Sequence, residues 1–335
     1  MSQGVIVRIE GRLGRLSLNR PQALHALNLA MCEAMLAALD AWRDDPAVEG
    51  VLIDHAEGRG FCAGADIRRI AAEGASLGRP FFATEYRLNH ALFTYAKPVI
   101  AFMDGVVMGG GAGLALPARA RIATERTVFA MPETAIGLIP DVGGGWHLPR
   151  LEGEVGTWLG LTGARLDGAD CLALGLATHL APSDGIEDLK AALIGGAPLP
   201  APVPRPASSL DRARIDALFA ADRVTDIRDA LRREGSDWSL RQAAVLDARC
   251  PMSLTATLRQ LRLGRQAADF AQVLELEYRL CTRLVDRPDF REGVRAAVID
   301  KDQSPRWAPT SLEAVAEDAV NALFAPLPFD EAWRP

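Results

Sequence analysis

Short apolar runs alternate with amphipathic stretches along the first half of the chain. Val5–Ile9 and Leu13–Leu18 carry basic residues at alternate positions on either side of Gly11, a pattern typical of a β-hairpin. Further short runs, rich in β-branched residues, predict buried strands at Val51–Ile53, Val99–Met103 and Ile122–Ala123. Because these runs alternate with helical stretches, we expect an α/β fold.

The helical stretches between the strands have recognisable limits. A helix is predicted over Leu29–Trp42, with Asn28 as its N-cap and an end near Pro46. Two more are predicted at Ile67–Glu73 and Phe81–Tyr95. A pair of strands followed by a helix, repeated along the chain, would form ββα units rather than simple βαβ units.

The pattern changes after residue 194. Gly195–Pro206 is rich in proline and lacks periodicity, as expected of an extended linker or a surface excursion. Beyond it the pattern predicts helices at Asp211–Ala220, Thr225–Arg233, Trp238–Ala248, Leu254–Leu263, Phe270–Val285 and Leu312–Phe324. We therefore expect a core at residues 1–194 that carries the site, a linker at 195–206, and a helical region at 207–335 packed on the core.

Composition and charge narrow the class of partner. Of the 335 residues 49% are hydrophobic and 24% charged, which is ordinary for a globular protein. The net charge of -6 and the pI near 5.5 argue against nucleic acid as the main partner. The five cysteines form no C-x-x-C pair, and the histidines show no H-x-x-H spacing. Reduced thiols and no metal site are therefore expected.

The N-terminal stretch M-S-Q-G-V-I-V-R-I-E already has the pattern of a strand and lacks a signal peptide or an arginine-rich presequence. No apolar run reaches the ~20 residues needed to span a membrane. We therefore expect a cytoplasmic protein without a membrane partner.

A glycine block, Gly109–Gly113, follows the predicted strand at Val99–Met103. Backbone N–H groups at such a strand-to-helix turn can face a developing oxyanion, with Gly110 as the candidate donor. A tight turn that only allows close helix packing is the plainer alternative. A dinucleotide-binding motif fails, because Leu114 stands where G-x-G-x-x-G needs its third glycine.

A second candidate donor lies in the turn G-R-G-F-C-A-G-A-D-I. The N–H of Ala65 can face a ligand just before Asp66, which is predicted to cap the next helix. Capping alone would explain Asp66. Cys62 in the same turn has no basic neighbour before Arg68, so an inert thiol is expected.

Two carboxylates eight residues apart, Glu133 and Asp141, bracket the stretch P-E-T-A-I-G-L-I-P-D. Such acids can accept or hold a proton beside an oxyanion site. Taken singly, each has a plain explanation: Glu133 as the acidic residue of a helix start, and Asp141 as a helix cap. Together, beside the glycine block, they favour a catalytic site.

A third carboxylate, Glu85, shares a predicted helix face with Phe81, Leu88 and Leu92. A carboxylate on an apolar stripe is costly unless it is paired or functional. A buried ion pair with Arg87 or another arginine and a catalytic role are both open.

The string G-A-S-L-G at Gly74–Gly78 matches the G-x-S-x-G pattern of a nucleophile elbow, which requires a strand before it and a helix after it. Here a helical pattern precedes the string and Arg79-Pro80 follows, so a surface loop is predicted.

Several of these strings resemble the crotonase (enoyl-CoA hydratase/isomerase) superfamily, and most closely its 3-hydroxyisobutyryl-CoA hydrolase subgroup. They are F-C-A-G-A-D-I, K-P-V-I-A, M-G-G-G-A-G-L, P-E-T-A-I-G-L-I-P-D-V-G-G-G, S-L-T-A-T-L-R-Q-L, L-E-L-E-Y-R-L and F-R-E-G-V-R-A-A-V-I-D-K-D-Q-S-P-R-W. The resemblance runs from about Val5 to Trp307.

The resemblance implies a spiral of ββα repeats with helices appended at the C-terminus. It implies a CoA thioester whose carbonyl oxygen is held by the N–H groups of Ala65 and Gly110, with Glu133 and Asp141 as catalytic acids. A glutamate in the family's E-Y-x-L-N string contacts substrate, which here is Glu85. No cofactor beyond the CoA of the substrate is implied, and a homo-oligomer is open.

One departure from the hydratases bears on the reaction. Hydratases carry a second acid/base glutamate two residues after the glycine triplet, where this sequence has Gly113. The second acid stands instead at Asp141, where hydratases usually have glycine. Ala65 also replaces a glycine common in the hydrolase subgroup, but only its backbone N–H is required.

The resemblance therefore implies hydrolysis of 3-hydroxyisobutyryl-CoA to 3-hydroxyisobutyrate and CoA, a step of valine degradation. Glu133 would activate water or form a transient mixed anhydride. The alternatives are an enoyl-CoA hydratase or isomerase on the same fold, and a non-catalytic CoA-ester-binding protein. Three basic residues, Arg20, Arg68 and Arg69, lie near the relevant turns, and solvation at the surface explains each of them.

Overall fold

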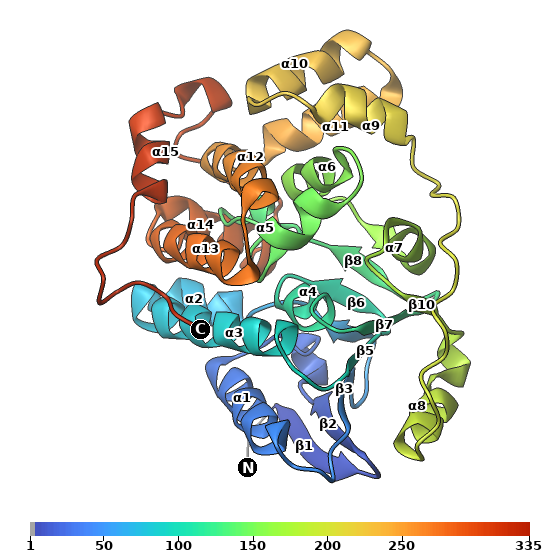
Figure 1. Cartoon of the computed structure of the whole chain (residues 1–335). Coiled ribbons are helices and arrows are strands. Elements are labelled where there is room, and N and C mark those ends of the chain that lie inside the picture. Colours follow the sequence, from blue (N-terminus) through green and yellow to red (C-terminus); the bar gives the residue numbers. More distant parts are fainter. Residues whose placement is uncertain (1–3) are drawn as a thin grey trace.

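The computed structural model describes residues 4–335 and contains two β-sheets wrapped by helices (Figure 1). Residues 1–3 of the predicted N-terminal strand stretch lie outside the described part. The first sheet has the strand order β1 (Val5–Glu10), β2 (Leu13–Leu18), β3 (Gly50–His55), β5 (Val99–Met103), β7 (Ala120–Ala123) and β10 (His179–Leu180). The second has the order β4 (Gly60–Cys62), β6 (Val106–Met108), β8 (Val128–Ala130) and β9 (Leu166–Asp167).

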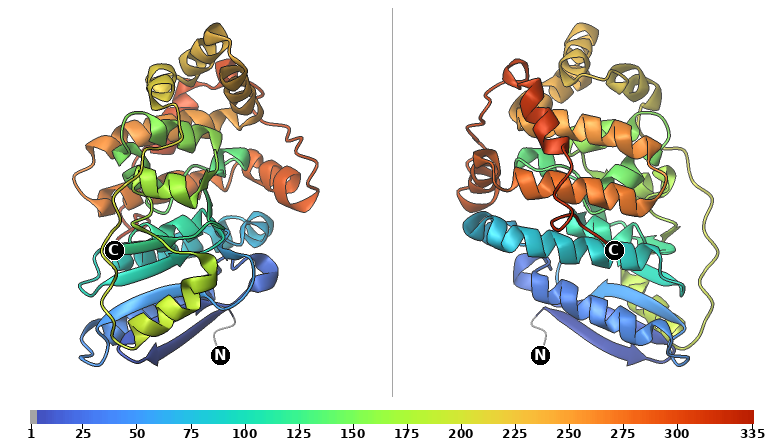
Figure 2. Two further views of the ribbon diagram at one scale, coloured as in Figure 1. Left: turned by 90° about the vertical axis from the view of Figure 1, so that its right-hand side faces the viewer. Right: turned by 60° about the vertical axis from the view of Figure 1, so that its left-hand side comes forward.

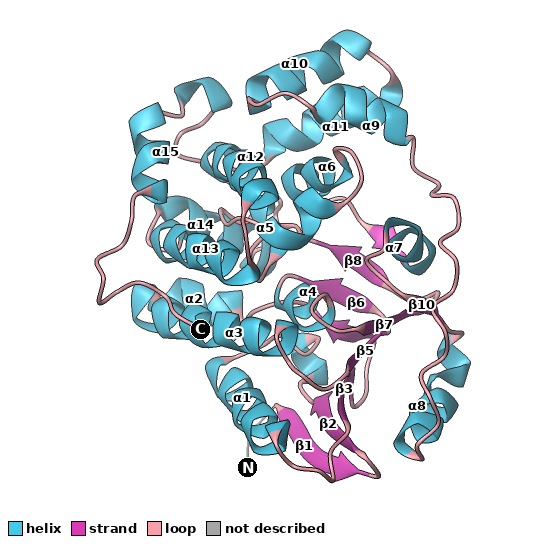
Figure 3. Ribbon diagram, in the orientation of Figure 1, coloured by secondary structure: helices cyan, strands magenta, loops and turns pink. Residues whose placement is uncertain are grey.

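From β3 to β8 consecutive strands alternate between the two sheets, which makes this part of the chain a spiral. β3, β5 and β7 pair in parallel in the first sheet, and β4, β6 and β8 pair in parallel in the second. Each turn of the spiral therefore contributes one strand to each sheet, and the polypeptide leaves the second strand toward the helical layer (Figure 3). The predicted α/β class and its ββα repeats are confirmed, as is the antiparallel hairpin of β1 and β2.

The helices of the first part have the following bounds: α1 (Leu29–Arg43), α2 (Ile67–Glu73), α3 (Ala75–Phe93), α4 (Gly110–Ala115), α5 (Gly144–His147), α6 (Val155–Thr162), α7 (Gly168–Leu174) and α8 (Ile186–Ile194). As predicted, the side chain of Asn28 caps α1 by accepting from the N–H of Met31 at 3.0 Å. Short 3-10 turns occur at Pro21–Ala23, Glu133–Ala135, Leu148–Arg150 and Ser183–Gly185.

The predicted surface loop at Gly74–Gly78 is wrong, because α3 begins at Ala75 and runs through Pro80. Gly78 is buried, and a Cβ there would lie 3.4 Å from Val285 and 3.5 Å from Ile70. This packing outweighs the missing N–H of Pro80, which alone disfavours a helix interior by about 3 kcal/mol.

The C-terminal half is helical, with α9 (Arg212–Phe219), α10 (Val224–Glu234), α11 (Asp237–Ala248), α12 (Pro251–Gln266), α13 (Phe270–Leu284), α14 (Pro288–Val294), a π-helical turn (Arg295–Ile299), a 3-10 turn (Leu312–Ala314) and α15 (Glu317–Phe324). The single helix predicted over Leu312–Phe324 is therefore two elements, and α14 escaped prediction. α13 packs on α3, and α12 packs on α5 and α6. Residues 197–207 have no regular structure and run along the outside of the molecule (Figure 2). The division into three parts stays a prediction.

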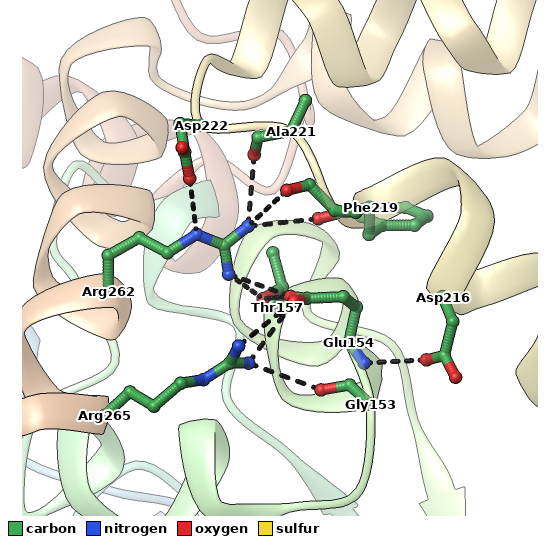
Figure 4. A network of polar contacts seen from close by, with 10 residues as sticks. Gly153, Glu154, Thr157, Asp216, Phe219, Ala221, Asp222, Arg262 and Arg265 are labelled. Atoms are coloured by element: carbon green, nitrogen blue, oxygen red, sulfur yellow. Dashed lines mark hydrogen bonds and ion pairs between the residues drawn. The ribbon is translucent and has the colours of Figure 1, made fainter.

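An ion-pair network connects the end of α9 to the helical layer (Figure 4). Arg262 on α12 donates to Glu154 at 2.8 Å and to Asp222 at 3.0 Å. Its remaining N–H groups bind the carbonyls of residues 219–221. Arg265 also reaches Glu154, so one carboxylate pairs with two helical arginines. The network adds to the apolar contacts of Ile215, Leu218 and Phe219, which attach α9 to the core.

The apolar core lies between the sheets and the helices and is continuous from Val5 to Trp333. A smaller apolar cluster lies between the first sheet and α8. None of the helices within residues 4–335 combines the length and the apolar character needed to cross a lipid bilayer.

Candidate active site

One cavity of about 440 Å³ brings together every site residue predicted from the sequence. It is lined by Ala65, Glu85, Gly110, Glu133 and Asp141. These residues come from the turn before α2, from the middle of α3, from the start of α4 and from the segment after β8. A larger cavity, about 810 Å³, lies beside the Arg262 network, where Arg262 pairs with two of its carboxylates, Glu154 and Asp222.

The two candidate N–H donors lie in adjacent turns. A Cβ on Gly64 would lie 3.7 Å from the N atom of Gly110, so the turn before Ala65 touches the start of α4. Gly64 and Gly109 have φ of +107° and +47°, which L side chains rarely adopt. Within residues 4–335 neither the Ala65 N–H nor the Gly110 N–H has an acceptor. Both donors are available to one ligand oxygen.

Glu133 and Glu85 lie directly over these glycines. A Cβ on Gly109 would lie 3.1 Å from Oε1 of Glu133, and a Cβ on Gly110 would lie 2.5 Å from Oε1 of Glu85. Both side chains are buried, and Oε2 of Glu133 and Oε1 of Glu85 have no partner in the described chain. Each of the two carboxyl groups beside the donors thus has a buried oxygen without a partner, which is costly for folding alone.

Glu85 makes no ion pair with Arg87 or any other arginine of the described residues, so the ion-pair alternative for Glu85 is wrong. Arg87 instead donates to the carbonyl of Arg334.

Asp141 is held by a hydrogen bond and not by helix capping. The Tyr86 hydroxyl donates to its Oδ2 at 2.6 Å, and the Cys281 thiol lies 3.7 Å from the same oxygen. α5 begins at Gly144 with Gly143 as its N-cap, so the capping alternative for Asp141 is wrong. Tyr86, next to Glu85 on α3, was missed by the sequence analysis although it lies in the E-Y-x-L-N string.

The three carboxyl groups share one apolar enclosure, and this changes their acidity. Burial raises the pKa of Asp141 to about 6, against the opposing effect of the Tyr86 hydrogen bond. Burial, then the charge of Asp141, raises the pKa of Glu133 well above its usual value. The pKa of Glu85 is raised by burial, then by Asp141 and Glu133. Buried like charges cannot all ionise together, so at least one of the three holds a proton near neutral pH.

Two side chains of the C-terminal helices hold the segment that carries Asp141. Glu277 on α13 accepts from the N–H of Gly143 and from the N–H of Gly145, each at 2.8 Å. Gln260 on α12 donates to the Pro140 carbonyl at 2.8 Å. The segment is thus bound on both sides of Asp141. Neither residue was predicted as part of the site, although Glu277 lies in the string L-E-L-E-Y-R-L.

Between those two anchors Val142 has a φ of +52°, which is unfavourable for a β-branched residue. Its side chain lies against Gly113: a Cβ on Gly113 would be 2.6 Å from Cβ of Val142 and 2.8 Å from Nδ2 of Asn89. Asn89 also donates to the Gly113 carbonyl at 3.0 Å. The position of the missing hydratase glutamate is therefore filled by protein, with no room for any side chain.

Two smaller predictions about the turn before α2 have different outcomes. Asp66 is the N-cap of α2, but its side chain makes no capping hydrogen bond and instead pairs with Arg20 at 2.9 Å. Cys62 is buried and its pKa is raised to about 12 by burial, as expected for an inert thiol.

The basic residues nearest the donors are engaged elsewhere. Arg20 pairs with Asp66, Arg69 pairs with Glu73, and Arg68 donates to the Val298 carbonyl. Arg165 and Arg249 do line the cavity, and the sequence analysis missed both; the guanidinium group of Arg249 donates to the Thr162 carbonyl.

Within residues 4–335 no group of three or more His, Cys, Asp and Glu side chains has an arrangement that could hold a metal ion. All five cysteines are buried and free.

Comparisons with known proteins agree with this architecture. The sequence model of the enoyl-CoA hydratase/isomerase family matches residues 13–324. The mitochondrial 3-hydroxyisobutyryl-CoA hydrolase of Gallus gallus is 40% identical over 96% of this chain and 89% of its own length.

Two solved structures superpose closely. An enoyl-CoA hydratase from Rhodobacter sphaeroides has a TM-score of 0.93 and 41% identity over 99% of this chain and 100% of that chain. A carnitinyl-CoA dehydratase from Mycobacterium thermoresistibile has a TM-score of 0.91 and 37% identity over 97% of both chains. The crotonase-like fold expected from the sequence is confirmed, and the chain belongs to the enoyl-CoA hydratase/isomerase family.

Proposed function

We propose that this protein hydrolyses the thioester of 3-hydroxyisobutyryl-CoA, giving 3-hydroxyisobutyrate and CoA, a step of valine degradation. The filled position at Gly113 carries the proposal. Hydration of a double bond needs a second acid/base group to deliver a proton to carbon, and here Val142 and Asn89 occupy its place. The names of relatives such as the Gallus gallus hydrolase support the same reaction.

In the proposed reaction the thioester oxygen lies between the N–H groups of Ala65 and Gly110. Glu133 takes a proton from water as the water oxygen attacks the carbonyl carbon. The two N–H groups hold the resulting oxyanion. When the carbon–sulfur bond breaks, the proton returns from Glu133 to the departing thiolate. No cofactor is needed beyond the CoA of the substrate.

Asp141 and Glu85 are proposed to bind the β-hydroxyl of the substrate and so to place the carbonyl against Glu133. Tyr86 fixes one oxygen of Asp141, which leaves the other oxygen for the substrate. The free Oε1 of Glu85 faces Gly110 and is open to the same hydroxyl.

A hydratase is the second candidate, because the superposing structure from Rhodobacter sphaeroides is named an enoyl-CoA hydratase at 41% identity. Thiol release from 3-hydroxyisobutyryl-CoA, measured beside hydration of crotonyl-CoA, separates the two. We expect thiol release and negligible hydration. Hydration alone would overturn the proposal, and binding of both esters without turnover would indicate a non-catalytic CoA-ester-binding protein.

The location of the chain is a separate matter. The names of curated relatives place those proteins in the mitochondrion, whereas a cytoplasmic location of this chain stays a prediction. Oligomerisation is likewise a prediction from the family resemblance.

The pH dependence of turnover is expected to reflect the buried carboxyl groups. A protonated carboxyl group cannot act as a base, so kcat/KM should rise with pH as the site loses its proton. Because the pKa of Asp141 is raised to about 6 and that of Glu133 lies well above its usual value, the half-maximal point should lie at about pH 6 or above. A profile that is already flat above pH 5 would contradict shared burial of these acids.

Restoring the hydratase glutamate by Gly113→Glu should damage the fold and give no hydration. The new side chain would overlap Val142 and Asn89, and overpacking of this kind costs about 1–3 kcal/mol. Thermal unfolding should show a lower Tm than the control Gly185→Glu, where the nearest atom to a Cβ is 3.7 Å away. Equal Tm values for the two variants would show that the space beside Gly113 can open.

A further inference from the structure

A second, basic cavity of about 420 Å³ lies at the far ends of the helices that carry the candidate active site. α4 begins with Gly110 and ends just before Leu116, which lines this cavity. Phe93 at the end of α3 and His147 at the end of α5 line it as well. Two of these helices, α3 and α4, connect the two cavities, because Glu85 of α3 and Gly110 of α4 line the candidate active site.

The charge of this cavity is entirely of one sign. Its lining includes no aspartate or glutamate, and it includes the four arginines Arg119, Arg121, Arg150 and Arg205. Within residues 4–335 none of the four forms an ion pair. The four arginines around this opening therefore carry positive charge that no lining carboxylate balances. A bound anion would offset that charge.

Two of these arginines have a structural role that does not remove their charge. Arg121 donates to the carbonyls of Ala118, Gly175 and Leu176. Arg150 donates to those of Trp146, Gly264 and Ala267. Neutral carbonyls satisfy N–H groups but do not neutralise a cation. Burial, followed by the charge of Arg205, lowers the pKa of Arg121 to about 10. The cationic form of Arg121 is therefore destabilised in this cavity.

The other polar groups of the cavity have no partner at all. Arg119 and Arg205 are exposed and make no hydrogen bond or ion pair within the described chain. The guanidinium group of Arg205 nevertheless lies against the backbone of Gly175, 2.5 Å from where a Cβ would stand, so it is directed at the cavity wall. Nε2 of His147 is also buried without a partner. Free donors thus surround the opening.

We infer that this cavity binds a phosphate group, as inorganic phosphate or as a phosphate monoester. The planar guanidinium groups of Arg119 and Arg205 offer paired N–H donors that match two oxygens of a tetrahedral anion. A phosphate carries nearly two negative charges at neutral pH, so it offsets more of this charge than a monocarboxylate does. His147 can add one hydrogen bond from its ring.

The test is a calorimetric titration of the full chain with inorganic phosphate and, in a second arm, with phenyl phosphate. Arg205→Gln should weaken binding about tenfold or more, and adding Arg119→Gln should weaken it further. Both variants should keep wild-type thioester hydrolysis in phosphate-free buffer, because neither residue touches the active-site cavity. Tighter binding of one probe identifies whether the free anion or an ester is preferred.

Two control variants make the outcome specific. Arg223→Gln removes another exposed arginine without an ion pair, from the lining of the larger cavity beside the Arg262 network, and should leave binding unchanged. Arg165→Gln removes a guanidinium group from the active-site cavity and should also have no effect. The inference is overturned if wild-type protein binds neither probe, if the double variant binds as tightly as the wild type, or if Arg165→Gln abolishes binding.

Discussion

Replacing Glu133 with glutamine is expected to lower kcat for thioester hydrolysis by about 10²- to 10⁴-fold, the usual contribution of a general base. The amide keeps the size of the side chain over Gly109 but cannot accept a proton from water. Binding of the CoA ester should change little, because the N–H donors of Ala65 and Gly110 are untouched. Steady-state kinetics and ester binding measured on one preparation separate the two effects.

The same variant should be more stable than the parent at alkaline pH. Burial keeps Glu133 protonated to a higher pH in the folded state than in the unfolded state. The folded state therefore loses stability, relative to the unfolded one, as pH rises above the ordinary glutamate pKa. Removing the acid removes that loss, so the Tm of Glu133→Gln should exceed that of the parent at pH 8, and the difference should vanish near pH 4.

Glu33→Gln is a suitable control for both measurements, since Glu33 is exposed on α1 and forms no ion pair in the described chain. It should match the parent in kcat and in Tm. Near-parental turnover by Glu133→Gln would remove Glu133 from the mechanism, whereas a lowered Tm at pH 8 would contradict the raised pKa of Glu133.

Replacing Glu277 with glutamine should lower kcat by about 10²-fold although this residue does not line the active-site cavity. Its two oxygens accept from Gly143 and Gly145, and glutamine offers only one acceptor oxygen. One N–H would then face an amide NH₂ group, and an unsatisfied buried donor costs about 1–3 kcal/mol. The segment would shift to relieve that contact, moving Asp141, and displacements of about 1 Å can cost about 10²-fold in rate.

A purely structural role for Glu277 predicts a different result. It would lower Tm and the amount of active enzyme without changing the pH profile of the enzyme that remains. A positioning role predicts a lower kcat per active site and a shifted acid limb, because Asp141 loses its fixed contact with Tyr86. Glu275→Gln is the matched control. Glu275 lies on the same helix as Glu277 and pairs with Arg279, one turn further along that helix. Equal kcat values for the two variants would exclude the positioning role.

Periodicity was sufficient for the elements whose local signals agree with their packing. The hairpin around Gly11 and the helix capped by Asn28 were predicted closely, because turn and cap residues coincide there with the apolar pattern. The start of α3 was not predicted, because Pro80 is a local signal against a helix. The burial of Gly78 against distant parts of the chain overrides that signal. The break before α15 likewise has no signal in the apolar pattern of Leu312–Phe324.

For the site, the motifs identified residues that line one cavity and to which we assign roles in the proposed reaction. They could not identify partners that come from distant parts of the chain. Glu277 follows Gly143 by more than a hundred residues, and Gln260 lies on a different helix again. Nothing local distinguishes such a glutamate from a solvated one, because its role depends on how α13 docks against the segment after β8.

The contact between Val142 and Gly113 also constrains how these enzymes can diverge. A relative with a carboxylate at the position of Gly113 must carry glycine or another small residue at the position of Val142, because the two side chains would occupy the same space. The two positions should therefore change together across the family. A single substitution at either position would leave the protein overpacked or with a cavity. An interconversion of hydrolase and hydratase therefore requires a paired mutation. The minimal candidate is Gly113→Glu with Val142→Gly.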